Sequence, residues 1–321
     1  MAATMRDVKN KTGLSLATIS KYLNGGNVLP ENRILIEKAI KELNYEVNVL
    51  ARGLVKNKTK IVGVMVHDIE CFFSGKMLHY IGQELRRNGY GMMICDSGND
   101  ETIEAENLKF LVSRKVDGII VMPVSMKGGF MKPAKQDKIP VVLVDRDVKG
   151  AQFDGVFVDN QRGSYDGVME LIKAGHERIA IITGPETSKP GKDRCQGYLQ
   201  AMEDSGLAVP EEYVACGDFK IAKAYECTGR LLGLKEPPTA IFTSNNLSTL
   251  GCLKYLTEHK VKIGRDISLM GFDDIDALRM IDYRISVVDR DAREQGREAM
   301  RLLQECFEDS GKSRQRGKRI T

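Results

Sequence analysis

The feature that most constrains the fold is an alternation, from residue 60 onwards, between short apolar runs and longer amphipathic segments. The predicted strands cover residues 61–66, 91–95, 118–121, 141–144, 156–158, 179–182, 213–216, 239–243 and 267–270. The predicted helices cover residues 75–88, 102–113, 129–136, 162–174, 193–204, 222–232 and 247–259. Apolar strands separated by helices indicate parallel sheets with helices on both faces. We therefore predict an α/β core of two doubly wound parallel-sheet lobes, whose strand ends surround one cleft.

The first sixty residues have a different pattern, one of short helices joined by turns. A helix-forming segment over 6–11 precedes the turn Thr12-Gly13-Leu14, and Ser15 can N-cap a second helix. In that helix the side chains predicted to face inward are Leu14, Ile19 and Leu23, and those predicted to face outward are Leu16, Ala17, Ser20 and Lys21. A third helix over 30–45 would bury a stripe of Ile34, Ala39, Ile40 and Leu43. The pattern predicts an all-α helix-turn-helix head.

The charge distribution agrees with a DNA-binding head. Residues 1–60 hold 11 Lys and Arg against 5 Asp and Glu, a net charge of +6, whereas the remaining residues hold 37 against 39, a net charge of −2. Phosphate contacts supply most non-specific affinity for DNA, so a basic module on a near-neutral body is typical of a DNA-binding protein. Charge alone would also fit a solvated surface, and the helix-turn-helix pattern favours DNA binding.

Composition places the chain among soluble globular proteins. It is 42% hydrophobic and 29% charged, which is enough to bury a sizeable core. We find no signal peptide and no apolar stretch of about 18 residues, so we expect a cytoplasmic protein without a membrane anchor. The seven cysteines form no Cys-x-x-Cys pair, which suits reduced thiols better than disulfides.

Polar residues follow several predicted strands, where they would line the cleft. They are Asp68, Asp145, Asn245 and the pair Asp273-Asp274. Together with Arg194 as a fork-shaped donor and Phe72-Phe73 as flat apolar surfaces, they suit a small hydroxylated ligand or a base. We expect Arg194 and Asp273 to grip this ligand across the two lobes. The alternative for each Asp or Asn is that it caps the following helix.

Enzyme and metal-site motifs are not found. The sequence holds no Gly-x-Ser-x-Gly, His-Glu-x-x-His or Gly-x-Gly-x-x-Gly motif, and Gly191-Lys192 resembles a phosphate loop only superficially. Of the four histidines, no two have metal-ligand spacing. We therefore predict a protein that is not an enzyme and needs neither a metal ion nor another cofactor.

A set of short motifs is spread over nearly the whole chain. They are Thr18-Ile19-Ser20, Leu23-Asn24, Tyr45, Asn48-x-x-Ala51-Arg52-x-Leu54, Val116-Asp117-Gly118-Ile119, Val158-Asp159-Asn160, Gly175-His176 and Gly271-Phe272-Asp273-Asp274. In these motifs the chain closely resembles the lactose-repressor-type (LacI/GalR) family of bacterial transcription regulators. The resemblance implies a homodimer with a periplasmic-binding-protein-like core. Its head would bind a palindromic operator, and its cleft would bind a small effector.

The resemblance also implies roles for individual residues. The positions that match base-reading residues are Leu16, Ala17 and Lys21, and those that match phosphate-contacting residues are Thr4, Ser15, Thr18, Ser20, Asn24 and Arg33. Asn48, Ala51 and Leu54 match a hinge helix that folds on DNA, where Leu54 would wedge into the minor groove. In the free protein Leu54 could instead pack on the core. The positions that match effector-binding residues are Phe72, Phe73, Asp145, Arg194, Asn245 and Asp273.

The expected domain organisation follows from the same pattern. The head covers 1–46, the hinge and linker 47–60, the N-terminal lobe 61–160 with 289–321, and the C-terminal lobe 161–288. The family usually has a proline two residues after the tyrosine, whereas this chain reads Tyr45-Glu46-Val47-Asn48, so we expect weaker hinge folding. We also expect the sequence to be truncated at its end, and its lack of leucine-zipper heptads argues against tetramers.

Three alternatives remain for the ligand and the role. We favour a sugar as the effector, and a purine is the alternative because of the aromatic pair. A repressor that also needs a phosphocarrier protein as coregulator is a second alternative, and a sugar-binding transport protein is a third, which the head opposes. Effector binding could either release or tighten DNA binding. The expected location is the bacterial cytoplasm, at the nucleoid.

Overall fold

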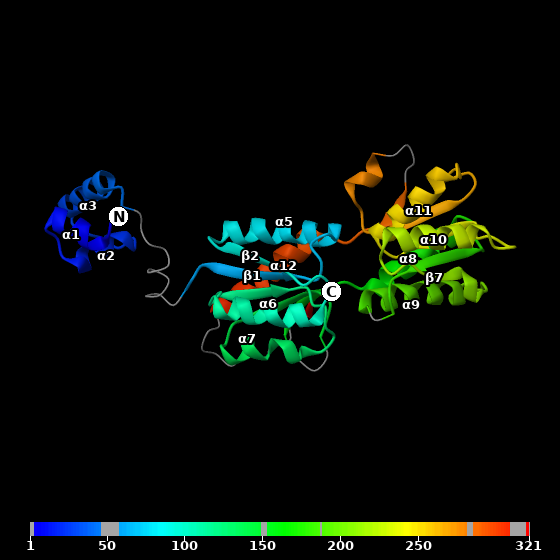
Figure 1. The fold of residues 1–321 in the computed structure, drawn as a ribbon, viewed down its shortest axis with the longest axis horizontal. Coiled ribbons are helices and arrows are strands. Elements are labelled where there is room, and N and C mark those ends of the chain that lie inside the picture. The colour runs from blue at the N-terminus through cyan, green and yellow to red at the C-terminus, as the bar shows by residue number, and fades with distance from the viewer. Residues whose placement is uncertain are drawn as a thin grey trace. The chain divides into compact units, whose positions relative to one another are not determined.

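The computed structural model describes residues 3–45, 58–148, 153–186, 188–280, 285–308 and 319–320. The chain divides into two compact units, Met1–Lys60 and Ile61–Thr321 (Figure 1). The predicted hinge contacts of Asn48, Ala51 and Leu54 lie outside the described residues. No helix in the described ranges is both long enough and apolar enough to cross a membrane.

The head is a bundle of three helices, α1 (Met5–Thr12), α2 (Leu16–Leu23) and α3 (Pro30–Leu43). Its buried core consists of Val8, Ile19, Ile36, Ala39 and Tyr45.

The predicted stripe of α3 was partly wrong, because Ile34 is 66% exposed. The buried face follows the helical spacing of Ile36, Ala39, Ile40 and Leu43, with the last two partly buried. Ile34 lies two residues before Ile36, and two residues of a helix turn the chain by about 200°, onto the opposite side.

The first sheet of the core has six parallel strands. Their order is β11 (Arg319–Ile320), β5 (Asp154–Phe157), β4 (Val141–Asp145), β3 (Gly118–Val121), β1 (Ile61–Val66) and β2 (Gly91–Asp96). On one face the apolar core includes side chains of α5 (Phe72–Arg87) and α12 (Ala292–Glu308). On the other face it includes α6 (Glu101–Ser113), the 3-10 turn η1 (Gly128–Met131) and α7 (Lys132–Gln136). Figure 1 shows α5 and α6 on opposite sides of this sheet.

The second sheet has five parallel strands. Their order is β10 (Ser286–Val288), β9 (Ser268–Phe272), β8 (Ala240–Thr243), β6 (Ile179–Thr183) and β7 (Val214–Cys216). One face packs against α10 (Ile221–Leu232) and α11 (Asn246–Glu258), and the other against α8 (Asn160–Lys173) and α9 (Lys189–Asp204). Two short 3-10 turns, η2 (Glu211–Tyr213) and η3 (Asp276–Arg279), complete the described elements. The predicted fold class of two doubly wound parallel sheets with a helical head is confirmed.

Helices α8 and α9 pack unusually closely because of a glycine. A Cβ at Gly197 of α9 would lie only 2.2 Å from the carbonyl oxygen of Gln161 and 2.9 Å from the Cβ of Ser164, both on α8. Only glycine permits this approach.

Within the described residues the chain crosses twice between the two sheets. It leaves the first sheet after β5, enters the second through α8, and returns from β10 to α12. Neither β10 nor α12 is among the elements predicted from the sequence. β10 has only three residues, none of them buried, so it lacks the apolar run that indicates a core strand.

Candidate functional site

The second helix of the head begins as its sequence predicts. The Ser15 hydroxyl oxygen accepts the backbone N–H of Thr18 at 3.1 Å, which makes Ser15 the N-cap of α2. Leu14 and Leu23 are half-buried in the head core, and Ile19 is fully buried. The outward positions Leu16, Ala17 and Lys21 are exposed and Ser20 is half-buried, so the predicted orientation of α2 is confirmed. The positions that match base readers therefore lie on the solvent side of α2.

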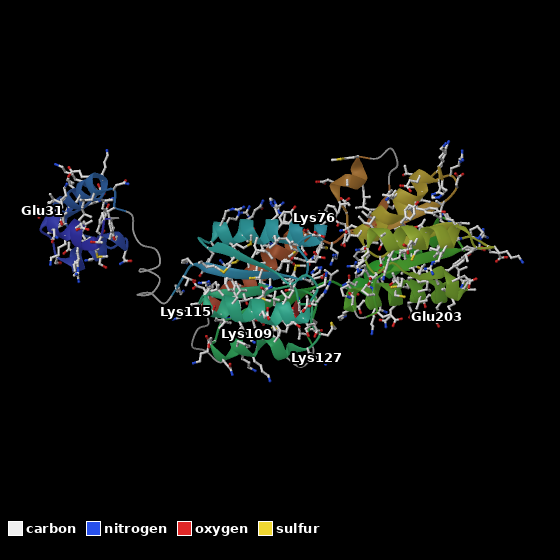
Figure 2. All side chains as sticks on the ribbon, viewed as in Figure 1. Glu31, Lys76, Lys109, Lys115, Lys127 and Glu203 are labelled. Atoms are coloured by element: carbon white, nitrogen blue, oxygen red, sulfur yellow. The ribbon has the colours of Figure 1, made fainter. Side chains whose placement is uncertain are left out.

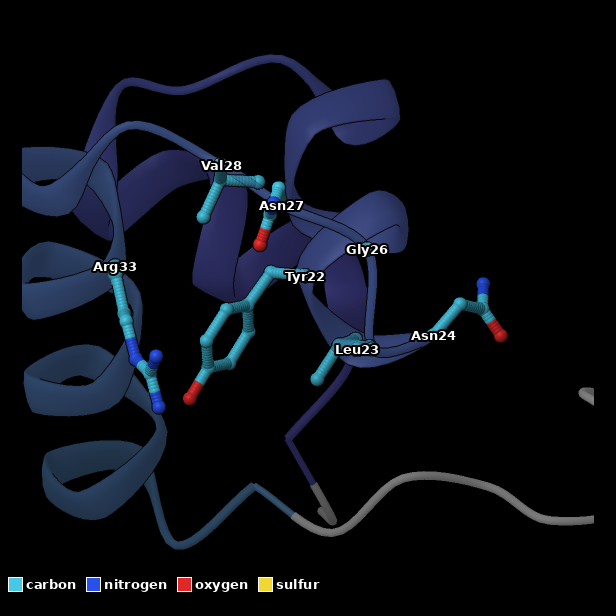
Figure 3. Close-up of a pocket in the computed structure, with 8 residues that line it drawn as sticks. Tyr22, Leu23, Asn24, Gly26, Asn27, Val28 and Arg33 are labelled. Carbon is cyan, nitrogen blue, oxygen red and sulfur yellow. The ribbon is translucent and has the colours of Figure 1, made fainter.

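A pocket of about 540 Å³ lies where α2 ends and the next loop begins (Figure 3). It is lined by Tyr22, Leu23, Asn24, Gly25, Gly26, Asn27, Val28 and Arg33. The side-chain amide of Asn24 donates to the carbonyl oxygen of Ser20 at 2.8 Å. A Cβ at Gly26 would lie 2.7 Å from Cγ of Lys21, so the loop packs directly against the stem of that lysine. This contact restricts Lys21 at the end of the exposed face.

Two residues that match phosphate contacts are paired inside the head. The Thr4 hydroxyl donates to Asp7 at 2.7 Å, and hydrogen bonds from Thr4 lower the pKa of Asp7. Arg33 Nε donates to Glu37 Oε1 at 2.9 Å, and the Tyr22 hydroxyl donates to the same oxygen at 2.9 Å. Both carboxylates are exposed, and exposed pairs contribute little stability. Neither pair therefore contributes much to the stability of the head.

In the core, one arginine joins carboxylates from the two sheets. Asp145 ends β4 of the first sheet, and Asp273 follows β9 of the second. Arg290 donates from Nε and Nη2 to the two carboxylate oxygens of Asp273, at 2.6 and 3.0 Å, and from Nη1 to Asp145. These residues are 6 to 8% exposed. Charge-assisted, bidentate hydrogen bonds of this kind are the strong ones, so this bridge between the sheets organises the site.

The backbone at both carboxylates is left-handed. The φ angle is +69° at Asp145 and +71° at Asp273. Residues other than glycine rarely adopt this region, and such strain of about 1–3 kcal/mol persists only where the surroundings enforce it. The strained residue is thus the last residue of β4 and the first residue after β9, and both side chains reach Arg290.

Arg194 belongs to the same cluster. Its Nε donates to Asn160 Oδ1 at 2.9 Å, its Nη1 donates to the carbonyl oxygen of Ser244 at 2.6 Å, and Nη1 lies 3.9 Å from Asp273 Oδ2. The guanidinium lies 3.7 Å above the ring centre of Phe272. Burial, followed by the charge of the neighbouring Arg290, lowers the pKa of Arg194 to about 10.

Aromatic side chains support both arginines. The Arg290 guanidinium lies 3.5 Å above the ring centre of Phe73, which is 4% exposed. Phe72 is 45% exposed and makes no aromatic or cation–π contact with the described arginines. Of the predicted aromatic pair, only Phe73 therefore belongs to the cluster as it is arranged here.

Electrostatics within the cluster are strongly coupled. Burial alone would raise the pKa of Asp145, but Arg290 and then Arg146 outweigh it and hold the pKa below its ordinary value of 3.8. Burial, and then the charge of Arg146, lowers the pKa of His67 to about 3, so that imidazole is neutral at pH 7. Burial disfavours the charged form of Arg290, but the negative charges of Asp273 and Asp145 outweigh this effect and raise the pKa of Arg290.

The structure brings together four of the six predicted effector residues, namely Phe73, Asp145, Arg194 and Asp273. Asn245 instead caps α11, since its Oδ1 accepts the N–H of Ser248 at 2.8 Å.

The expected grip by Arg194 and Asp273 across the lobes was wrong. Both belong to elements of the second sheet, α9 and the end of β9. The groups that meet across the sheets are Asp145 and Asp273, through Arg290. Lys76 of α5, labelled in Figure 2, adds a second link by donating to the carbonyl oxygen of Asp274.

Four members of the site are not among the residues predicted from the sequence, namely Arg290, Arg146, His67 and Asn160. His67 directly follows β1 and Arg146 directly follows β4, so the rule that selected Asp145 could have found both. Asn160 stands in a recognised motif. Arg290 follows β10 by two residues, and the rule could not apply because that strand was not predicted.

Comparisons with known proteins agree with this architecture. The profile of the periplasmic binding protein-like domain matches residues 168–320. The PurR repressor of Haemophilus influenzae is 31% identical over 305 residues, covering 94% of this chain and 90% of the relative. The CytR repressor of Escherichia coli is 30% identical, covering 94% of this chain and 89% of the relative. The structure of the Lac repressor dimer bound to operator shares the fold, with a TM-score of 0.86 at 21% identity over 100% of this chain and 96% of that chain.

The relatives at 30 to 31% identity are named helix-turn-helix transcriptional repressors, and the similarity extends over the head as well as the core. The head in this structure has the N-capped second helix of such a protein, and the core has a buried polar cluster where its two sheets meet. This chain therefore belongs to the LacI/GalR family of DNA-binding, effector-controlled transcriptional regulators.

Proposed function

We propose that this protein is a repressor whose operator binding is controlled by a sugar bound where the two sheets meet. The observation that carries this proposal is the bridge from Asp145 through Arg290 to Asp273. Sugar hydroxyls both donate and accept hydrogen bonds, and adjacent carboxylates and guanidiniums match both functions. The relatives named PurR support a purine as the second candidate, for which the exposed ring of Phe72 would offer a stacking surface.

Effector binding would act on the same bridge. A ligand that forms hydrogen bonds with Asp145 and Asp273 competes with Arg290 for them and so weakens the bridge between the two sheets. Coupling free energies between two sites are typically about 1–3 kcal/mol, which corresponds to about a 5- to 150-fold change in operator affinity.

The test is a thermal-shift screen of sugars, sugar phosphates and purines, followed by operator titrations with and without the ligand found. We expect a sugar to change operator affinity, and Asp273→Asn to abolish that response. Asp166→Asn on the exposed face of α8 is the matched control and should keep the response. A response to purines alone would reject the sugar proposal and support the second candidate.

For the DNA-reading residues we propose the roles that the resemblance implies. Lys21→Ala should weaken operator binding and change base preference, because Lys21 is exposed and has no ion-pair partner among the described residues of the head. Arg33→Ala should weaken binding to all operator sequences alike and reduce the salt dependence of that binding. Competition binding on randomised operators measures both effects, and an unchanged preference in Lys21→Ala would remove it from the base readers.

For the hinge we propose that Leu54 kinks the operator. Leu54→Ala should keep effector binding but lose operator affinity and DNA bending, since inserting an apolar wedge bends the duplex. Wild-type curvature of the bound DNA with this variant would reject the role.

We propose that the protein acts as a homodimer. The edge strand β2 leaves Ile94 43% exposed, and α6 beside it leaves Ile103 43% and Phe110 42% exposed. Exposed apolar side chains at and beside a sheet edge are typical of an interface between chains. Sedimentation of the full chain tests this, and Phe110→Glu should shift any dimer toward monomer.

The proposed domain boundaries are those expected from the sequence, with lobes over 61–160 plus 289–321 and over 161–288. The positions of the two crossings between the sheets support them. We further propose a regulatory role without catalysis, in the bacterial cytoplasm. Cell fractionation tests the location, and binding assays test the regulatory role.

A further inference from the structure

The first turn of α2 presents apolar side chains to the solvent at the positions that match base readers. Leu16 is 38% exposed and Ala17 is exposed as well, at the first two positions of the helix. Neither side chain carries a hydrogen-bond donor or acceptor. Of the three positions that match base readers, only Lys21 can therefore form a side-chain hydrogen bond to a base.

The polar side chains at the two ends of α2 form hydrogen bonds within the head. The Ser15 hydroxyl oxygen accepts the backbone N–H of Thr18 at 3.1 Å, and the two hydroxyl oxygens of Ser15 and Thr18 lie 2.9 Å apart, at hydrogen-bond distance. At the other end, the side-chain amide of Asn24 donates to the carbonyl oxygen of Ser20 at 2.8 Å. The outward tip of the first turn is therefore left to Leu16 and Ala17.

The core of the head does not use these two apolar residues. The described head core takes Ile19 from α2 as its buried residue, with Leu14 and Leu23 half-buried, and neither Leu16 nor Ala17 belongs to it. Single exposed apolar residues are common on protein surfaces and need no explanation. Two in succession at the end of the helix that contacts DNA bases are different, because they decide what that helix can recognise.

The major groove of DNA offers such residues one distinguishing group. Each base pair presents there a pattern of hydrogen-bond donors and acceptors, and thymine adds the methyl group on its C5 atom. A leucine or alanine side chain cannot bond to the donors and acceptors, but it can bury that methyl group away from water. The N-terminal residues of the second helix in a helix-turn-helix are those that contact base edges.

We infer that Leu16 and Ala17 recognise the C5 methyl groups of thymines in each operator half-site, while Lys21 supplies the hydrogen-bonded contact. This inference rests on the proposed base-reading role of these residues and names the chemical group that two of them read. The same methyl group is present on 5-methylcytosine, so the class of base recognised is a C5-methylated pyrimidine.

The experiment removes single methyl groups from the operator. An operator is first selected from randomised duplex DNA with the full-length chain, with and without the ligands of the thermal-shift panel. Each thymine of one half-site is then replaced by deoxyuridine, which keeps the base pairing and lacks only the methyl group. We expect the affinity to fall about fourfold at each contacted thymine, the effect of exposing one buried methyl group, and to stay unchanged at the others.

Cytosine gives the converse test at the same positions. Replacing a contacted thymine by cytosine, with guanine opposite, changes the donors and acceptors of the base pair. Replacing that cytosine by 5-methylcytosine then restores the methyl group alone. We expect 5-methylcytosine to bind more tightly than cytosine by about the same factor that separates thymine from uracil.

Variants assign each methyl group to a side chain. Leu16→Ala should bring the ratio of thymine to uracil affinity close to one at one position, and Ala17→Gly should do so at another. Leu35→Ala is the matched control, because Leu35 is 46% exposed but lies on α3, and it should keep both ratios. Each ratio compares two DNA duplexes with one protein, so a smaller folded fraction in a variant cancels.

Three outcomes would overturn the inference. Equal affinity for thymine and uracil at every position of a selected half-site would overturn it and leave the DNA-binding function intact. Methyl preferences that Leu16→Ala and Ala17→Gly both retain would show that other side chains read these groups. Failure to select any sequence would reject the proposed base-reading role together with the inference.

Discussion

Replacing Arg290 by glutamine should destabilise the core by about 3 kcal/mol. The substitution removes three hydrogen bonds to Asp145 and Asp273, which are 7% and 6% exposed. Removing one partner of a buried ion pair typically costs about 3–5 kcal/mol, because a charge is left uncompensated. Here Arg146 lies 3.7 Å from Asp145 and Arg194 lies 3.9 Å from Asp273, so part of the charge stays neutralised and the lower end applies.

Urea unfolding at pH 7 measures this loss. With a slope of about 3 kcal/mol per molar urea, the midpoint of the core transition should fall by about 1 M. Arg162→Gln, which breaks an exposed pair with Asp166, is the control and should change stability by less than about 0.5 kcal/mol. A loss below about 1 kcal/mol for Arg290→Gln with an unchanged slope would refute the reasoning, since a true buried bridge costs more.

The pH dependence gives an independent check. With Arg290 present the pKa of Asp145 is lowered, so its stabilising effect is present above the ordinary value of 3.8 and is lost as pH falls through the folded value. Without Arg290 the largest of the charges that lower the pKa of Asp145 is lost, so this pKa should rise and the deficit of Arg290→Gln should shrink as pH falls from 7. Adding Asp145→Asn should remove that pH dependence and recover part of the lost stability.

Three further predictions concern other parts of the chain. Ser15→Ala removes the hydrogen bond to Thr18 and should destabilise the head by about 1 kcal/mol, measured by its thermal unfolding; an unchanged melt would contradict the capping role. Gly197→Ala places a methyl group 2.2 Å from the carbonyl oxygen of Gln161 and should lower the free energy of unfolding by about 1–3 kcal/mol or more. Gly75→Ala is the control, because a Cβ at this helical glycine meets open space and should not destabilise the protein. Equal effects of the two variants in urea titrations would reject the packing argument. Burial raises the pKa of Glu104 above 4.5, so its contribution to stability should decrease as pH rises from 4.5 through the folded value; Glu104→Gln should remove this slope, and an identical slope in both proteins would exclude the effect.

The sequence predicted those features that depend on local pattern. Long apolar strands and the Ser15 cap each need only a few neighbouring residues, and both are present. The register of α3 was wrong because Ile34, Leu35 and Ile36 are all apolar, and only packing decides which of the three is buried. The two carboxylates were found because parallel strands end at one edge.

The centre of the site could not be predicted for a physical reason. Arg290 follows a three-residue strand that pairs with β9 but has no buried residue of its own, so its place depends entirely on tertiary contacts. The partners of Asp145 and Asp273 lie 145 and 17 residues away in the chain. Asn245 shows the reverse case. It was predicted to line the cleft, whereas a local hydrogen bond from Ser248 explains its place as the cap of α11.

Arg290 stands on the second of the two crossings, between β10 and α12, and this has a consequence for how the lobes would move apart. A segment about which two bodies rotate is normally passive, but here it carries the side chain that is bonded to both. If rotation separates Asp145 from Asp273, the guanidinium can keep its hydrogen bonds to only one of the two carboxylates. Asp273 holds it by two hydrogen bonds and Asp145 by one, so we expect Arg290 to stay with Asp273 and leave Asp145 exposed to the incoming ligand. A crystal structure of an open form would show which carboxylate keeps its hydrogen bonds to Arg290. The segment between β10 and α12 would then act as a switch with two positions, one with Arg290 bonded to both carboxylates and one with Asp145 released.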